Sequence, residues 1–464
     1  MTSTPIPTTF RSLTWVLWGA ALLLLGLATL WLPPDGDQAL FYISGRKIVD
    51  GAVVYRDFID LKPPLIYYLN AVAIILFGDS FLSVRILETL FQFGAIGLIV
   101  VVMRRATRDD RLAIAAGVIH AAIYFGMNFN DRAQVEGFAA LPIAALIYLL
   151  CVKRGRAAYL VAGLCLGILG LLKTTLLILL LPSLLVLFIS VEQSRRRWWN
   201  GANLLAGTAV PFGIMFLLLG LAGALDDYAN VQRFVSGYAA QQLGSPMALL
   251  NGLVRIVPTY LARIWSLLAV LLIAFGIVSI LVRTVPRLPE RLTREHFDSP
   301  RARLILFVLT ALMVLALSIV VEGKFLSWHF VRLLVPAAIL GAFGMDALFP
   351  RRFEWRRHTI LFTLMGLILI GSAILFSPLP RILWSGTASI VHARRGIEGF
   401  AAFYGDGGDG GGNAYSHTAI GAVGRMMKEK LEPGETFYVA SGWGVCSTSM
   451  PGPCRSSKST TPVS

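Results

Sequence analysis

The residues of this sequence that could do chemistry are carboxylates and cations within or beside long apolar runs. They are Asp35, Asp37, Asp57, Asp60, Lys62, Arg85, Asp131, Arg132, Glu136, Lys173, Arg233, Lys324, His329 and Arg332. A carboxylate can take the proton of a hydroxyl group, and lysine or arginine can stabilise a departing phosphate. An ionisable side chain at membrane depth costs on the order of 2.5–3.5 kcal/mol, so such residues usually face a cavity. Their combination favours a reaction in which a base removes a proton and a phosphate leaves.

Each of these residues also has a purely structural interpretation. Acids in loops, such as Asp37, are normally solvated. Glu136 could cap the start of a helix, and Lys173 could lie in a turn between two spans. The interfacial position of His329 fits a belt of anchoring residues at the membrane surface. The chemical interpretation therefore depends on the elements that bring these residues together.

The composition is that of a polytopic α-helical membrane protein. Hydrophobic residues make up 56% of the 464 and charged residues only 14%, and the mean hydropathy is +0.71. Apolar stretches of roughly 20 residues, the length of a membrane span, recur along the chain. The first stretch ends in Pro33-Pro34 without a cleavage site, which indicates an anchor. The net charge of +15 does not indicate a nucleic-acid partner, because the basic residues are concentrated in connections between apolar segments.

The placement of charge predicts eleven spans. The apolar segments are 13–33, 81–103, 112–128, 133–152, 157–173, 175–191, 201–224, 257–282, 304–321, 328–349 and 359–378. Basic residues crowd alternate connections, around 104–111, 153–156, 195–197, 283–303 and 351–357. By the positive-inside rule these connections are cytoplasmic, which puts the N-terminus inside and the C-terminal tail outside. The fold class is therefore all-α, with residues 1–378 as the transmembrane domain.

Residues 64–78 are apolar but are not predicted to cross the membrane. If they did, the loop at 104–111 would fall outside and every later connection would oppose its charge. Pro63-Pro64 fits the start of a helix, since proline is tolerated in the first turn. We therefore expect 34–80 to form one large outer loop that contains short interfacial helices.

Residues 379–464 form a compositionally distinct tail. "GDGGDGGGN" is a flexible linker, "AIGAVGRMMKEKL" is typical of a short amphipathic helix, and "ETFYVAS" is typical of a strand. The tail is either disordered or part of a truncated small domain. Cys151 and Cys165 lie in apolar helices and are expected to serve packing, whereas Cys446 and Cys454 lie in the tail.

The stretch "DGDQALFYISGRKIVDGAVVYRDFIDLKPPLIYYLNAVAIILFGDSFLSVRIL" resembles the first outer loop of C-type-fold membrane glycosyltransferases. These include protein O-mannosyltransferases, aminoarabinose transferases that act on lipid A, and bacterial proteins that build surface polysaccharide. The family's loop opens with an acidic pair, where this chain has Asp37 and then Gln38. The other matching positions are Gly51, Tyr55, Lys62, Pro63, Pro64, Gly78 and Arg85.

Three further stretches are similar to segments of the same family. "NDRAQVEGFAALPIAALIYLL" points to Glu136, and "GLCLGILGLLKTTLLILLLP" points to Lys173. "EGKFLSWHFVRLLVPAAILGAFG" points to Lys324 and His329. The resemblance covers roughly residues 13–378.

The resemblance implies an inverting transfer of a sugar from a polyprenyl-phosphate donor to a hydroxyl acceptor, which is a glycan, a lipid or a protein. Asp37 would be the general base, or Asp35 if the register differs by two residues. Lys62, with Lys173 or Lys324, would stabilise the departing polyprenyl phosphate. Glu136 would bind sugar or acceptor, or support the base. The site would lie on the outer face of a bacterial inner membrane.

Other substrate-binding candidates are Tyr55, Arg85, His329 and Arg332, of which Arg332 is a further cation that could bind phosphate. No cofactor is expected, since glycine-rich nucleotide loops and zinc-type ligand spacings are missing from the sequence. Gln38, in place of a second acid, leaves a role for a divalent cation open. The alternatives are a transporter or flippase of lipid-linked sugars, in which the same cations would bind phosphate without catalysis, and an inactive or truncated relative.

Overall fold

The computed structural model describes the larger part of the chain. The described residues are 8–30, 34, 36–127, 129–189, 194–242, 247, 250–251, 254, 267–284, 299–323, 325–348, 426 and 429–430. Asp35, Lys324, the expected span at 359–378, the expected strand of the tail and all but residues 426 and 429–430 of its expected helix lie outside this set.

Within the described residues the fold is helical throughout. The elements are α1 (Thr8–Ala28), α2 (Gly36–Val49), α3 (Leu65–Phe77), α4 (Phe81–Thr107), α5 (Asp110–Phe125), η1 (Phe129–Asp131), α6 (Val135–Tyr148), η2 (Leu149–Lys153), α7 (Arg156–Leu172), η3 (Thr174–Leu179), α8 (Leu180–Ile189), α9 (Ser194–Leu221), α10 (Leu225–Gln242), α12 (Leu267–Thr284), α14 (Pro300–Glu322), η6 (Ser327–Leu333) and α15 (Leu334–Leu348). The only extended pairing in this set is an isolated bridge between Val54 and Phe58. The predicted all-α class is confirmed.

Five of the described helical segments are long and apolar enough to cross a membrane. They are Phe81–Thr107, Val135–Lys153, Arg195–Leu221, Pro300–Glu322 and Ser327–Leu348. Shorter apolar helices accompany them at Trp18–Leu27, Leu65–Phe77, Arg156–Leu172, Thr174–Ile189 and Val270–Val282. The chain is therefore a multi-pass membrane protein, and the count of eleven spans stays a prediction.

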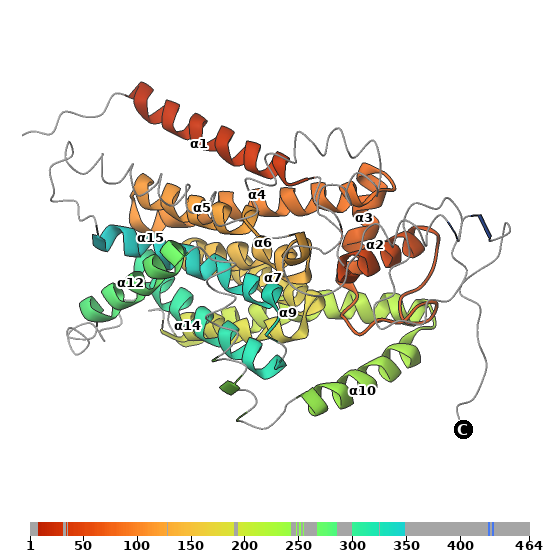
Figure 1. Ribbon diagram of the computed structural model, residues 1–464. Helices are drawn as coiled ribbons and strands as arrows, with labels where there is room; N and C mark the ends of the chain where they lie inside the picture. The colour runs from red at the N-terminus through yellow and green to blue at the C-terminus, as the bar shows by residue number, and fades with distance from the viewer. Residues whose placement is uncertain are drawn as a thin grey trace, which may run out of the picture.

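The long helices form a bundle with α2 and α3 at one end (Figure 1). α3 has 13 residues, so it is about 20 Å long, whereas the hydrocarbon core is about 30 Å thick. It begins after Pro64 and ends at Gly78, whose φ of 97° suits glycine. This length supports the prediction that α3 does not span. α10, which follows α9 after a short turn, was not predicted as an element.

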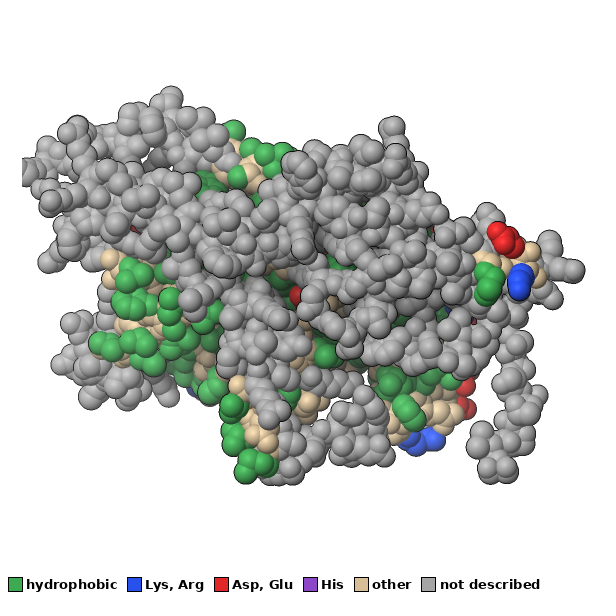
Figure 2. All heavy atoms as spheres, viewed as in Figure 1, with side chains coloured by type: hydrophobic (Ala, Val, Ile, Leu, Met, Phe, Trp, Pro, Cys, Tyr) green, Lys and Arg blue, Asp and Glu red, His purple; other side chains and the backbone are tan. Residues whose placement is uncertain are grey.

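Glycines allow two helix pairs of the bundle to approach closely. A Cβ on Gly163 of α7 would overlap the carbonyl oxygen of Leu204 on α9, and a Cβ on Gly276 of α12 would overlap that of Leu340 on α15. Small residues at such contacts are typical of membrane helices, where close backbone approach replaces hydrophobic burial as the source of attraction. Where α12 reaches the surface, hydrophobic side chains gather on it (Figure 2); they include Leu271 and Val278.

Candidate functional site

The first part of the site is an ion pair between Asp37 and Lys62. Asp37 lies in the first turn of α2, and Lys62 lies just before the two prolines that lead into α3. Lys62 Nζ donates to Asp37 Oδ2 at 2.8 Å, and both side chains are about one-third exposed, at 31% and 29%. The same ammonium group lies 4.2 Å from the centroid of the Phe41 ring, a distance that allows cation–π attraction. The fold thus brings together the predicted base and the predicted phosphate ligand.

A buried tyrosine fixes the backbone at Lys62. The hydroxyl of Tyr55 donates to the carbonyl oxygen of Lys62 at 2.9 Å, and only 1% of Tyr55 is exposed. Burial raises the pKa of Tyr55 well above 10, so the hydroxyl stays a donor. Tyr55 has a φ of 71°, which few residues other than glycine adopt. Tyr55 therefore positions Lys62 in the structure. Its contact with substrate stays a prediction.

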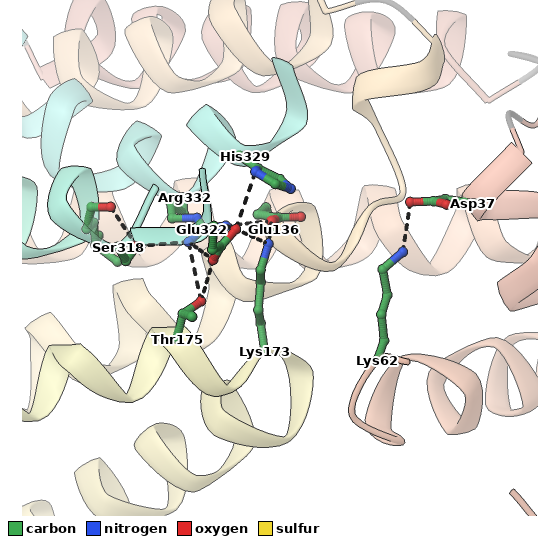
Figure 3. A network of polar contacts seen from close by, with 10 residues as sticks. Asp37, Lys62, Glu136, Lys173, Thr175, Ser318, Glu322, His329 and Arg332 are labelled. Carbon is green, nitrogen blue, oxygen red and sulfur yellow. Dashed lines mark hydrogen bonds and ion pairs between the residues drawn. The ribbon is translucent and has the colours of Figure 1, made fainter. Parts of the chain in front are cut away.

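The second part of the site is a group that we call the charged cluster: Glu136, Lys173, Glu322, His329 and Arg332, with Thr175 and Ser318. Lys173 Nζ lies 2.7 Å from Glu136 Oε1 and 2.8 Å from Glu322 Oε2. Arg332 bonds Glu322 through both terminal nitrogens, at 2.6 and 3.0 Å. It also donates to Glu136 at 2.9 Å and to Ser318 at 2.8 Å. Figure 3 shows this cluster beside the Asp37–Lys62 pair.

Four parts of the fold meet in the charged cluster. Glu136 comes from the first turn of α6, and Lys173 comes from the break between α7 and η3. Glu322 is the last residue of α14, while His329 and Arg332 come from η6. Arg332 is fully buried and Glu136 is 2% exposed, while Lys173 and Glu322 are partly buried, with 21% and 12% of their side chains exposed. Two carboxylates and two cations thus balance one another with little access to water. Such a group holds its geometry because breaking any pair leaves a buried charge unpaired.

A buried network connects the two parts of the site. Glu88 of α4 accepts from Arg85, Arg132, the hydroxyl of Tyr124 and the backbone amide of Ala133. It therefore anchors the segment that leads into α6 and Glu136.

Gln38 connects this segment to α2. Its amide nitrogen donates to the carbonyl oxygens of Phe129, at 2.7 Å, and Arg132, at 2.6 Å, and its oxygen accepts from Arg85 at 3.0 Å. Asp37 is thereby tied to the segment before α6. Asp131, in turn, accepts from the hydroxyl of Ser327 at the start of η6.

The structure sorts the predicted site residues into groups. Asp37 and Lys62 are paired, and Glu136, Lys173, His329 and Arg332 meet in the charged cluster. Arg85 is fully buried and holds the backbone in place, so its predicted contact with substrate stays a prediction. Asp35 and Lys324 lie outside the described residues.

Four residues of the site and its supporting network were not predicted from the sequence: Glu322, Thr175, Ser318 and Glu88. Glu322 carries the same signal as Glu136, since it is an acid at the end of an apolar span, whereas a hydroxyl in an apolar helix gives no such signal. No group of three or more His, Cys, Asp or Glu side chains that could hold a metal ion occurs among the described residues.

Comparisons with known proteins point to one class. Residues 61–231 match the model of the dolichyl-phosphate-mannose-protein mannosyltransferase family. The fold is similar to that of ArnT from Cupriavidus metallidurans, solved with undecaprenyl phosphate bound: the TM-score is 0.56 at 16% identity, over 93% of this chain and 83% of that one. The resemblance to the C-type-fold membrane glycosyltransferases is confirmed.

The oligosaccharyltransferase of Archaeoglobus fulgidus, tethered to an acceptor peptide, is 15% identical, with a TM-score of 0.46 over 83% of this chain and 58% of its own length. No curated protein sequence matches the chain.

Proposed function

We propose that the protein is a membrane glycosyltransferase that moves a sugar from a polyprenyl-phosphate donor to a hydroxyl acceptor. The observation that carries this proposal is the contact of 2.8 Å between Asp37 and Lys62. It places a carboxylate that can serve as a base next to a cation that can meet a phosphate. The family match over residues 61–231 and the fold likeness to ArnT support the same assignment.

The Asp37–Lys62 pair can couple the two halves of the reaction. The acceptor oxygen attacks the anomeric carbon, and its proton passes to the carboxylate of Asp37. The bond from the anomeric carbon to the phosphate oxygen breaks, and the electron pair leaves with the phosphate. Protonation neutralises the carboxylate of Asp37 that is paired with Lys62, while the departing phosphate gains one negative charge. Lys62 can then transfer its ion pair from Asp37 to the leaving group, with no change in the total charge of the site.

The wider context of the site follows from the charge pattern of the sequence. Basic connections on the cytoplasmic side leave α2 and α3 on the outer face, at the membrane surface of a bacterial inner membrane. The polyprenyl chain would lie against the apolar helices, and the acceptor, a glycan, lipid or protein hydroxyl, would approach from outside.

The test is turnover by the purified protein. The protein is reconstituted in lipid nanodiscs and incubated with a panel of polyprenyl-phosphate sugars and candidate acceptors, and the release of polyprenyl phosphate is followed. We expect release with at least one donor, and release roughly 10²–10⁴-fold slower when Asp37 is replaced by Asn. Binding of donors without release by the parent protein would favour a transporter or flippase instead.

A further inference from the structure

Nearly all hydrogen-bond donors of the charged cluster are bonded to acceptors within the cluster. The ammonium of Lys173 lies between the carboxylates of Glu136 and Glu322, and both terminal nitrogens of Arg332 are bonded to acids. A phosphate that approached Lys173 would meet two carboxylates beside a single ammonium. Like charges in contact are unfavourable, and no step of the proposed reaction removes either of these two. Lys62 differs, because its one carboxylate partner becomes neutral during transfer.

Two polar atoms at the edge of the cluster have no hydrogen-bond partner within the described part of the chain. Oε2 of Glu136 and Nε2 of His329 form no hydrogen bond with any described residue, and neither is among the fully enclosed orphan atoms of that part of the chain. In Figure 3 both lie on the side of the cluster that faces Asp37 and Lys62. Both side chains are otherwise buried, with 2% and 5% exposed. The cluster therefore holds two polar atoms ready for a ligand between it and the ion pair.

The free atoms are both acceptors. The carboxylate of Glu136 can only accept. Nδ1 of His329 lies 3.3 Å from Glu322 Oε2 but forms no hydrogen bond. The nearby carboxylate favours the neutral tautomer that carries its proton on Nδ1, which leaves Nε2 as an acceptor. A phosphate group offers further acceptor oxygens and no proton, and cannot satisfy these atoms. Hydroxyl groups can donate hydrogen bonds to both atoms. A polyol also adds no charge to a cluster in which two carboxylates and two cations balance.

We propose that Glu136 and His329 bind hydroxyl groups of the donor's sugar ring, and that Lys173 is not a phosphate ligand. Glu322 acts as a positioning residue, because it neutralises Lys173 and Arg332 and its carboxylate faces Nδ1 of His329 at 3.3 Å. The phosphate is left to Lys62. This assignment rests on the proposed function and divides the donor between the two parts of the site.

The test compares the affinities of two kinds of lipid. Undecaprenyl phosphate is measured alongside a panel of undecaprenyl-phosphate hexoses and pentoses, by direct binding to the protein in nanodiscs. We define the sugar increment as the dissociation constant of undecaprenyl phosphate divided by that of the undecaprenyl-phosphate sugar that binds the parent most tightly. In His329→Phe and Glu136→Gln we expect this increment to fall about tenfold or more, because each variant loses an acceptor for a hydroxyl. Both should bind sugar-free undecaprenyl phosphate within about twofold of the parent, which also shows that they are folded.

Two further variants separate the alternatives. Lys173→Met should bind undecaprenyl phosphate within about threefold of the parent, whereas a phosphate ligand would lose roughly ten- to hundredfold. His120→Phe removes a buried histidine that bonds Gln92, elsewhere in the bundle, and should leave the increment unchanged.

Three outcomes would overturn the sugar site: a parent protein with no increment for any sugar, an increment retained in His329→Phe, or weak binding of undecaprenyl phosphate by Lys173→Met. Failure of the proposed function would instead appear as Lys62→Ala binding undecaprenyl phosphate like the parent.

Discussion

At the scale of single residues, two side chains 25 positions apart form the ion pair that we propose to be the reactive part of the site. Asp37 and Lys62 are partly exposed and bonded to each other, whereas the residues behind them are buried. An ion pair with this exposure contributes little to stability. Its two charges can therefore be tested by substitution without loss of the fold.

We expect Asp37→Asn to lower turnover by roughly 10²–10⁴-fold, because the amide keeps the shape of the carboxylate but cannot take a proton from the acceptor. Release of polyprenyl phosphate at equal expression measures the effect. Asp35→Asn is the comparison and should cost much less. If Asp35→Asn is the inactive variant, the base lies two residues earlier, and if both variants retain activity the mechanism is wrong.

Lys62→Ala should weaken the use of donor roughly ten- to hundredfold, since one charge-assisted contact to phosphate contributes about 1.5–3 kcal/mol. The dependence of the initial rate on donor concentration gives the measurement, and a thermal unfolding curve shows whether the variant is folded. Turnover at the parent rate would exclude Lys62 as the phosphate ligand.

At the scale of elements, buried charges hold the segment between α5 and α6 in place. Glu88 on α4 lies between Arg85 and Arg132 and also accepts the amide of Ala133, and all three ionic side chains are fully buried. Gln38 and Ser327 attach the same segment to α2 and η6. The relative position of Asp37 and the charged cluster thus depends on polar contacts rather than on apolar packing alone.

Removal of Glu88 should therefore be strongly destabilising. Glu88→Ala leaves two guanidinium groups buried with no carboxylate between them, and we expect the free energy of unfolding to fall by about 3–5 kcal/mol. Unfolding in detergent, followed by circular dichroism, measures the change. Asp226→Asn, an exposed acid at the start of α10, is the control and should stay within about 0.5 kcal/mol of the parent. Equal stability of both variants would show that the network around Glu88 is not structural.

At the scale of the whole molecule, the predicted topology depends on whether α3 crosses the membrane. α3 is short, packs against α2, and exposes apolar side chains such as Ile75 and Leu76, as an interfacial helix does. A span at this position would reverse every later connection against its charge.

Impermeant thiol reagents can test this topology. In a background without the native cysteines, single cysteines near Asp57 and near Ser80 should both be labelled from the outer face, because α3 returns to the side from which it starts. A cysteine in the basic connection near Arg108 should be labelled only from the cytoplasm. Labelling of the first two positions from opposite faces would mean that α3 crosses and that the eleven-span model is wrong.

The class of the protein and several candidate site residues could be predicted from the sequence alone. Hydropathy marks spans because each must be apolar along its own length, and a charge within an apolar run, such as Glu136 or Lys173, is costly enough to be conspicuous. The motif around Lys62 supplied the resemblance to membrane glycosyltransferases. These signals are local, so they can be recognised before the fold is known.

Which charges meet could not be predicted from the sequence, because it depends on how the helices pack. Arg332 and Glu136 are 196 positions apart, and their contact depends on how α6, α14 and η6 pack. Arg85 and Tyr55 occupy positions of the family motif. In the fold both are buried, and both donate hydrogen bonds to other residues of the chain. Glu322 became the centre of the charged cluster because the end of α14 lies next to η6 and the break after α7. Such pairings follow from packing across the whole bundle, which local sequence patterns do not determine.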